Sequence, residues 1–229
     1  RNTEELPARL LSSAVGRVTF PVFSLVQHDK VRLKRILRKA LTTLMLVNFP
    51  VMIGLAIVAR PLVLVLFTEK WLPCVVYLQL LCGVGMLYPL HYINLNVLKA
   101  QGRSDLFFRL EIIKKVLTTA TILVTWRWGI SVIILGEICT SFIAYYLNSY
   151  YTGKLVDYPI TEQASDFLPS LLVAASMGLV VIAVGHFPYP SNSALLVAQV
   201  ASGAAVYVAL CFKCKMLDVT ELRRSFSAG

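Results

Sequence analysis

The chain has 229 residues, of which 57% are hydrophobic and 15% are charged, and its mean hydropathy is +0.71. A soluble globular domain carries about a quarter charged residues, so this composition excludes an ordinary soluble protein and indicates a membrane protein. The net charge of +10 would suit a nucleic-acid-binding protein, but the placement of the basic residues, described below, argues against that class.

Four uncharged stretches are long enough to cross the hydrocarbon core, which takes about 20 helical residues. They are 40–59, 71–98, 167–185 and 193–212. A fifth stretch, 128–153, contains one charge, and two mostly apolar segments, 10–27 and 106–126, contain several polar residues. We therefore expect an all-α, polytopic membrane bundle of about seven transmembrane helices.

The first expected helix, from residue 3 to about 27, carries an ordered polar stripe. Glu5, Arg9, Ser13 and Arg17 are each four residues apart, so they lie on one helix face. A cation within the membrane usually faces a water-filled cavity or an anionic ligand. Arg9, Ser13 and Arg17 are therefore candidate anion-binding residues.

The next segments lead to a candidate proton site. Residues 28–39 are expected to form an amphipathic basic connection, either a solvated helix start or a lipid-headgroup contact, before a second helix at 40–59. In the third helix, His91 and Asn94 are three residues apart and are expected to face the same cavity as the basic stripe. His91 is a candidate ion-coupling residue, and the alternative is a hydrogen-bonded packing residue.

The fourth expected helix carries a second polar stripe. Lys114, Thr118 and two further threonines share one face, which makes Lys114 and Thr118 candidate substrate-binding residues. The alternative for Lys114 is that its side chain extends to the membrane interface. Glu111 is four residues before Lys115, so we expect these two charges to neutralise each other.

The fifth expected helix contains Glu137 as its one charge. A lone carboxylate in a membrane is a common proton or cation site, so Glu137 is a second candidate for ion coupling. The alternative is a salt bridge to Arg9 or Arg17.

The last part of the chain differs in kind from the rest. Residues 154–166 are expected to form a polar loop, followed by an apolar, lipid-facing and peripheral hairpin at about 167–186 and 193–212. We therefore divide the chain into a five-helix lobe, 1–153, and a second part, 154–229, with a loop, a hairpin and a tail. The five cysteines lack partners for a zinc site, and no catalytic or metal-ligating set is expected.

The basic residues lie mainly on one side of the expected membrane. With alternating helices, one side carries fourteen Lys and Arg residues in its loops and the other side carries four. By the positive-inside rule the first side, which includes the C-terminus, is cytoplasmic. This topology, with contact to anionic lipid, accounts for the basic excess, and no nucleic-acid partner is expected.

Several short motifs together resemble a known family. Leu6-Pro7, Gly16-Arg17-Val18, the run 20–24 and the inner turn 100–106 with 112–115 are similar to those of polysaccharide and O-antigen flippases. These flippases belong to the multidrug/oligosaccharidyl-lipid/polysaccharide exporter superfamily. The resemblance covers residues 1 to about 150 by motif and the final hairpin by position.

The resemblance implies a two-lobed transporter of the bacterial inner membrane, not an enzyme. The chain would be most of the second lobe plus a terminal helix pair, and the start at Arg1 without a Met fits the C-terminal part of a longer protein, so the N-terminal lobe is an expected partner. The implied cargo is an undecaprenyl-pyrophosphate-linked oligosaccharide for O-antigen or exopolysaccharide synthesis, with H⁺ or Na⁺ as candidate coupling ions and no other cofactor. A polysaccharide polymerase and a chain-length regulator are further candidate partners.

Two other functions are compatible with the same chain. A multidrug or small-solute antiporter of the same superfamily would favour acidic cavity residues, whereas this chain has more membrane-embedded base than acid. A membrane glycan polymerase or ligase would need acid–base groups on an outer loop, where the loop 186–192 offers one imidazole, His186, and no carboxylate.

Overall fold

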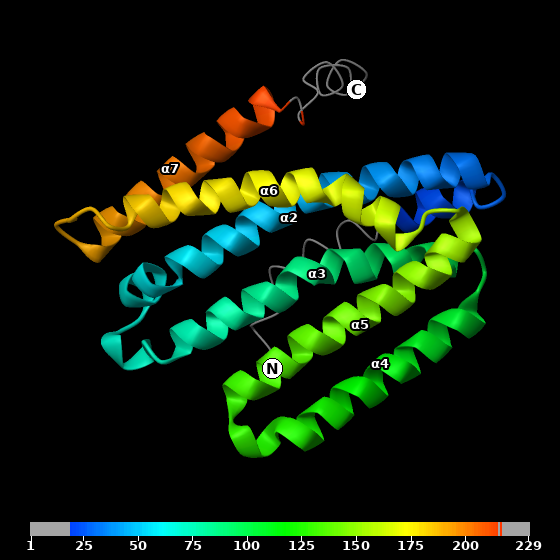
Figure 1. Ribbon diagram of the computed structural model, residues 1–229, viewed down its shortest axis with the longest axis horizontal. Helices are drawn as coiled ribbons and strands as arrows, with labels where there is room; N and C mark the ends of the chain where they lie inside the picture. The colour runs from blue at the N-terminus through cyan, green and yellow to red at the C-terminus, as the bar shows by residue number, and fades with distance from the viewer. Residues whose placement is uncertain (1–18, 215, 217–229) are drawn as a thin grey trace.

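Long helices run back and forth across the molecule in the computed structural model, which describes residues 19–214 and 216 (Figure 1). The first described residues, 19–25, are helical. The helices that follow are α2 (Lys30–Leu66), α3 (Cys74–Ala100), α4 (Ser104–Thr125), α5 (Ile130–Val156), α6 (Ile160–Val184) and α7 (Asn192–Lys213), with short 3-10 turns at Glu69–Trp71 and Trp126–Trp128.

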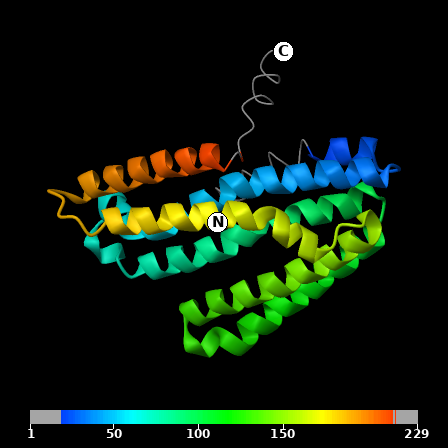
Figure 2. The same cartoon turned by 45° about the horizontal axis from the view of Figure 1, so that its top comes forward.

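Consecutive helices are antiparallel, so their connections collect at two ends of the bundle (Figures 1 and 2). The start of α2 and the α3–α4 and α5–α6 turns share one end, which we call the basic end, and α7 runs toward it from the other end (Figures 1 and 2). Nine described Lys and Arg residues lie in these segments, namely Lys30, Arg32, Lys34, Arg35, Arg38, Lys39, Lys99, Arg103 and Lys154. The expected charge asymmetry between the two ends is therefore present in the fold.

Helix α2 is much longer than a membrane requires. Its 37 residues correspond to about 55 Å, and the helix continues through Pro50 and Pro61. Asp29 caps its start by accepting a hydrogen bond from the backbone N–H of Arg32 at 2.9 Å. Of the two alternatives for residues 28–39, the helix start is present, because α2 begins at Lys30, ten residues before the expected start of the second helix.

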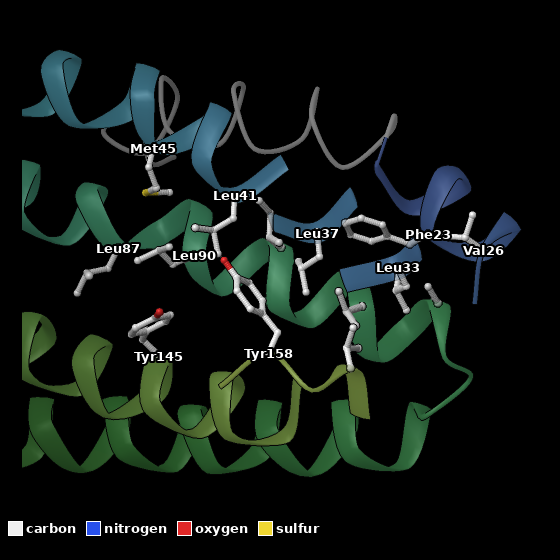
Figure 3. Packing of buried hydrophobic residues seen from close by; sticks show 14 of the residues in the cluster. Phe23, Val26, Leu33, Leu37, Leu41, Met45, Leu87, Leu90, Tyr145 and Tyr158 are labelled. Atoms are coloured by element: carbon white, nitrogen blue, oxygen red, sulfur yellow. The ribbon is translucent and has the colours of Figure 1, made fainter. Parts of the chain in front are cut away.

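Four-residue spacing explains why the basic start of α2 is helical. Leu33, Leu37, Leu41 and Met45 are fully buried on one face, while the basic side chains occupy the other faces. These residues join side chains of α3, α5 and α6 in the main core cluster (Figure 3). Leu90 and Tyr145 contribute to this cluster from α3 and α5.

The polar loop expected at 154–166 is also wrong. Helix α5 continues to Val156 and α6 begins at Ile160, which leaves three residues between them. The acidic residues that suggested a loop are paired with α2: Glu162 with Lys34 at 2.7 Å, and Asp166 with Arg38. Because these partners neutralise the carboxylates, α6 begins before its apolar stretch.

The terminal hairpin is less peripheral than expected. Helix α6 packs along α2, and a Cβ on Gly178 would lie 2.9 Å from Ile53 and 3.1 Å from Ile57. Helix α7 packs on α6 and α2, and its Tyr207 hydroxyl donates to the carbonyl of Leu46. The opposite face of α7 exposes Val197, Val200, Val208 and Phe212, as a lipid-facing helix does.

Five described helices, α2, α3, α5, α6 and α7, are long and apolar enough to cross a membrane. Helix α4 is as long as α7, at 22 residues, and lies antiparallel to α5 (Figure 2), but five charged residues lower its apolar character. The chain is thus a multi-pass membrane protein with an all-α fold. The division of the chain at residue 153 stays a prediction.

Candidate functional site

A cleft of about 440 Å³ lies between α3, α4 and α5. This volume is within the range of ligand-binding clefts, about 300–1,000 Å³. Its walls carry charged, hydroxyl, amide and aromatic side chains. They are Val84, Tyr88, His91, Tyr92, Leu95, Asn96 and Lys99 from α3, Phe107, Glu111, Lys114, Lys115, Leu117 and Thr118 from α4, and Glu137, Thr140, Ser141 and Ala144 from α5.

The structure brings together four residues that the sequence singled out separately. Lys114 and Thr118 line the cleft from α4, His91 from α3 and Glu137 from α5. The other three candidates, Arg9, Ser13 and Arg17, lie outside the described residues. The functions assigned to all seven residues stay predictions.

The ion pair within α4 differs from the expected one. Glu111 forms an ion pair with Lys114, three residues away, and not with Lys115. On a helix the third and fourth neighbours are both within reach, so sequence spacing does not choose between them. The carboxylate of Glu111 thus holds Lys114 on the cleft wall, and Lys115 lines the same cleft without an ion pair to a described carboxylate.

His91 is held by contacts behind the cleft wall. Its Nδ1 lies 3.3 Å from Nδ2 of Asn148, and its ring packs edge-to-face on Tyr145 with centroids 6.3 Å apart. These contacts fix the orientation of the ring, as in the alternative of a hydrogen-bonded packing residue. Asn94 does not face the cleft as expected, because it is fully buried and donates to Oε1 of Gln163 at 3.2 Å.

Glu137 lies one helical turn from two hydroxyl side chains of the cleft. Thr140 donates from Oγ1 to the carbonyl of Glu137 at 3.0 Å, and Ser141 is four residues further along the same wall. A carboxylate beside hydroxyl oxygens offers the hard oxygen ligands that protons and small cations prefer. The expected partners Arg9 and Arg17 lie in the part of the chain that is not described.

The α3 wall contains functional candidates that the sequence reasoning missed. Lys99 lies at its basic end, with Nζ 4.3 Å from the ring centroid of Phe107. Tyr88, Tyr92 and Asn96 follow one another at four-residue spacing and would have been found by the test that identified the α4 stripe. Asn96 is 4% exposed, and its amide nitrogen has no hydrogen-bond partner among the described residues.

The cleft has a modest excess of positive charge. Three lysines, Lys99, Lys114 and Lys115, and two glutamates, Glu111 and Glu137, line it. The three lysines lie toward the basic end, and the hydroxyl groups of α4 and α5 lie further along the helices. An anionic group flanked by polar, uncharged groups would complement this arrangement. Within residues 19–214 and 216, no cluster of His, Cys, Asp or Glu could hold a metal ion.

Comparison with known proteins finds relatives that are described as biosynthesis proteins. Residues 1–76 match a family described as polysaccharide biosynthesis protein. The chain is 28% identical over 190 residues to the lipopolysaccharide biosynthesis protein WzxC of Escherichia coli, and 27% identical over 233 residues to the teichuronic acid biosynthesis protein TuaB of Bacillus subtilis. These alignments cover 78% and 96% of this chain.

A solved structure has the same fold. The lipid II flippase MurJ, in an inward closed conformation, aligns with a TM-score of 0.70 over 89% of this chain at 20% sequence identity. The chain spans less than half the length of the proteins it matches: 38% of WzxC, 46% of TuaB and 43% of the MurJ chain. The comparisons therefore concern one part of a larger transporter fold.

Proposed function

We propose that the cleft of this chain forms part of the path of a lipid-linked oligosaccharide across the bacterial inner membrane. The chain belongs to the polysaccharide biosynthesis and flippase family of membrane proteins. The family comprises transporters and flippases rather than enzymes. The cargo proposed for this chain is an undecaprenyl-pyrophosphate-linked oligosaccharide used in surface polysaccharide synthesis.

The observation that carries the proposal is the set of three lysines in a cleft between membrane helices. Lys99, Lys114 and Lys115 come from two helices and face one volume of about 440 Å³. A cation within a membrane is costly unless water or an anion accompanies it, and a pyrophosphate is an anion of suitable charge. Arg9 and Arg17 would add guanidinium groups, which bind phosphate oxygens through two parallel hydrogen bonds.

The rest of the cleft is suited to the sugar part of the cargo. Thr118, Thr140 and Ser141 provide hydroxyl groups, and Tyr88 and Tyr92 provide rings with polar tips. Such groups can both donate hydrogen bonds to sugar hydroxyls and accept hydrogen bonds from them, so they would bind sugars without selecting one particular sugar. The excess of base over acid in the cleft argues against the alternative of a cationic drug as cargo.

Transport by this mechanism requires two lobes. In alternating access, this lobe and a second, N-terminal lobe would rock against each other around the cleft. The charged helix α4 would then be the sixth described helix that crosses the membrane. Binding of H⁺ or Na⁺ at Glu137, beside His91, would couple an ion gradient to this motion. The basic end would be cytoplasmic, and the C-terminus would lie on the same side.

Replacement of the three lysines in the full-length protein tests this function. A Lys99→Gln, Lys114→Gln and Lys115→Gln variant is expected to lose surface polysaccharide at normal protein abundance, because the anionic cargo loses its counter-charges. The matched control replaces three lysines outside the cleft, Lys30, Lys70 and Lys213, by Gln. Normal polysaccharide from the cleft variant at normal abundance would refute the proposed role of the cleft.

A further inference from the structure

A second, smaller groove lies at the basic end, between the last turns of α5 and the start of α6. Its volume is about 230 Å³, and it is lined by Tyr146, Ser149, Tyr150, Gly153, Lys154, Pro159 and Ile160. Ser141 in the cleft and Tyr150 in this groove are nine residues apart on α5, which is two and a half helical turns of 3.6 residues. The groove and the cleft therefore open on opposite faces of α5.

The outward face of α5 leading to the groove is apolar. Phe142 is 57% exposed, and Ile143 and Leu135 are also exposed on this helix. In a helix that crosses a membrane, apolar side chains exposed away from the transport cleft are in contact with acyl chains. An acyl chain that follows this face reaches the groove at Tyr146, whose side chain is 56% exposed.

The floor of the groove depends on a close approach of backbone atoms. A Cβ on Gly153 would lie 3.2 Å from Cα of Pro159, so the end of α5 and the start of α6 meet where no side chain intervenes. Tyr146 and Tyr150 form one wall of the groove. Tyrosines are enriched at the level of lipid headgroups, because their rings are apolar and their hydroxyl groups are polar.

The charge at the mouth of the groove is positive. Nζ of Lys154 lies 4.5 Å from the ring centroid of Tyr150, and no carboxylate in the described part of the chain forms an ion pair with it. Glu162 and Asp166 of α6 are instead paired with Lys34 and Arg38 of α2, and the exposed Asp157 does not line the groove.

The start of α6 adds to this positive charge. Its N-cap residue, Pro159, makes no side-chain capping bond, so the first N–H groups of the helix lack a side-chain partner. The N-terminus of a helix carries about half a positive charge, which favours a nearby anion.

We propose that this groove binds one anionic phospholipid of the cytoplasmic leaflet. The headgroup phosphate would lie between Lys154 and the N-terminus of α6, and one acyl chain would follow Tyr146 and the exposed apolar face of α5. Basic pockets between membrane helices on the cytoplasmic side bind such headgroups, and a single Lys near the surface contributes about 1 kcal/mol. The proposal requires that the basic end is cytoplasmic and is independent of the cargo of the cleft.

Fluorescence quenching by brominated lipids tests the site in the full-length protein. A Tyr146→Trp substitution places a reporter in the groove, and its signal is the difference from the unsubstituted protein. In phosphatidylcholine vesicles, brominated phosphatidylglycerol is expected to quench this reporter at about fivefold lower mole fraction than brominated phosphatidylcholine, the factor that corresponds to about 1 kcal/mol. Equal quenching by the two lipids would overturn the proposal.

Two further variants show whether the preference belongs to this groove. Lys154→Gln in the reporter background is expected to abolish it, and Lys213→Gln, which removes an exposed lysine at the end of α7 and outside the groove, is expected to leave it unchanged. A preference that survives Lys154→Gln would also overturn the proposal. Phosphatidylglycerol bound to the purified protein with its native tyrosines, counted by mass spectrometry before and after Lys154→Gln, gives a readout that does not depend on the reporter.

Discussion

At the residue scale, the ion pair between Glu111 and Lys114 sets the charge that the cleft offers. This pair leaves Lys99 and Lys115 as the lysines of the cleft without a carboxylate partner among the described residues. The side chains of Lys114 and Glu111 are 20% and 34% exposed, so solvent weakens their attraction only in part. Lys114 and Lys115 therefore differ in their charge environment although they are adjacent in sequence.

A double-mutant cycle tests this pairing. Glu111→Gln and Lys114→Gln are expected to be coupled by about 0.5 kcal/mol or more in unfolding free energy, because they share one contact. Glu111→Gln and Lys115→Gln are expected to be additive. The measurement is thermal or denaturant unfolding of the purified full-length protein, and coupling through Lys115 in place of Lys114 would contradict the structure.

The sequence predicted part of the candidate site at this scale. Four-residue spacing found the stripe of Lys114 and Thr118, and the cost of charge in a membrane found Glu137. Spacing did not reveal that Asn94 turns away from His91 toward Gln163, because that choice depends on α6, which is distant in sequence. Lys99 was missed because it was treated as the first residue of the expected turn, and Asn96 because it was placed in the third helix without a test of its four-residue spacing from Tyr88 and Tyr92.

At the scale of elements, the contact between α4 and α5 forms one side of the cleft. A Cβ on Gly136 would lie 2.4 Å from Cγ2 of Thr121, closer than side chains tolerate. Glycine thus allows the charged helix α4 to approach α5 closely. On the same face of α4, the Thr125 hydroxyl donates a hydrogen bond to the carbonyl of Thr121 at 2.6 Å. The width of the cleft depends on this approach.

Substitution of Gly136 is therefore expected to be costly. Gly136→Ala should destabilise the protein by about 1–3 kcal/mol through overpacking, and Thr121→Ser in the same chain should restore most of the loss, because serine lacks Cγ2. Gly54→Ala is the matched control, since its Cβ would meet Met177 at an ordinary 3.8 Å. Thermal unfolding measures all three, and equal effects of Gly136→Ala and Gly54→Ala would contradict this account.

The boundaries of the elements were predicted less well than their existence. Long apolar runs with at most one charge located the cores of α2, α3, α5, α6 and α7, because the membrane requires long apolar helices. The expected helices began too late in the chain at the basic end, because α2 and α6 extend beyond their apolar runs there as amphipathic helices. Their charges, such as Arg38 and Asp166, pair with one another across the two helices, and no local sequence pattern shows such a partner.

At the scale of the whole molecule, a buried polar cluster connects the terminal helix pair to the rest of the bundle. Gln163 of α6 is fully buried, accepts hydrogen bonds from Asn94 of α3 and Tyr145 of α5, each at 3.2 Å, and donates to the carbonyl of Tyr158 at 3.0 Å. The Tyr158 hydroxyl donates to Asp166 at 2.6 Å. Burial, together with this bond, raises the pKa of the Tyr158 phenol, so it remains a donor at neutral pH.

Removal of Gln163 is expected to loosen this connection. Gln163→Leu removes the acceptor of the Tyr145 hydroxyl at a cost of about 1–3 kcal/mol. It also removes one of the two acceptors of the Asn94 amide, which keeps its 2.8 Å hydrogen bond to the carbonyl of Leu90. Gln79→Leu is the control, because Gln79 donates one hydrogen bond to the carbonyl of Ala56 at an exposed position. A larger loss of unfolding free energy for Gln163→Leu supports the connection, and equal losses would contradict it.

The central claim is that the cleft between α3, α4 and α5 binds the anionic part of a lipid-linked oligosaccharide, and a binding measurement tests it most directly. The full-length protein and its Lys99→Gln, Lys114→Gln, Lys115→Gln variant would be titrated with a synthetic undecaprenyl-pyrophosphate-linked oligosaccharide in detergent. The account predicts at least a tenfold rise in Kd for the variant, about 1.4 kcal/mol, with an unchanged unfolding midpoint. An unchanged Kd in the folded variant would contradict it.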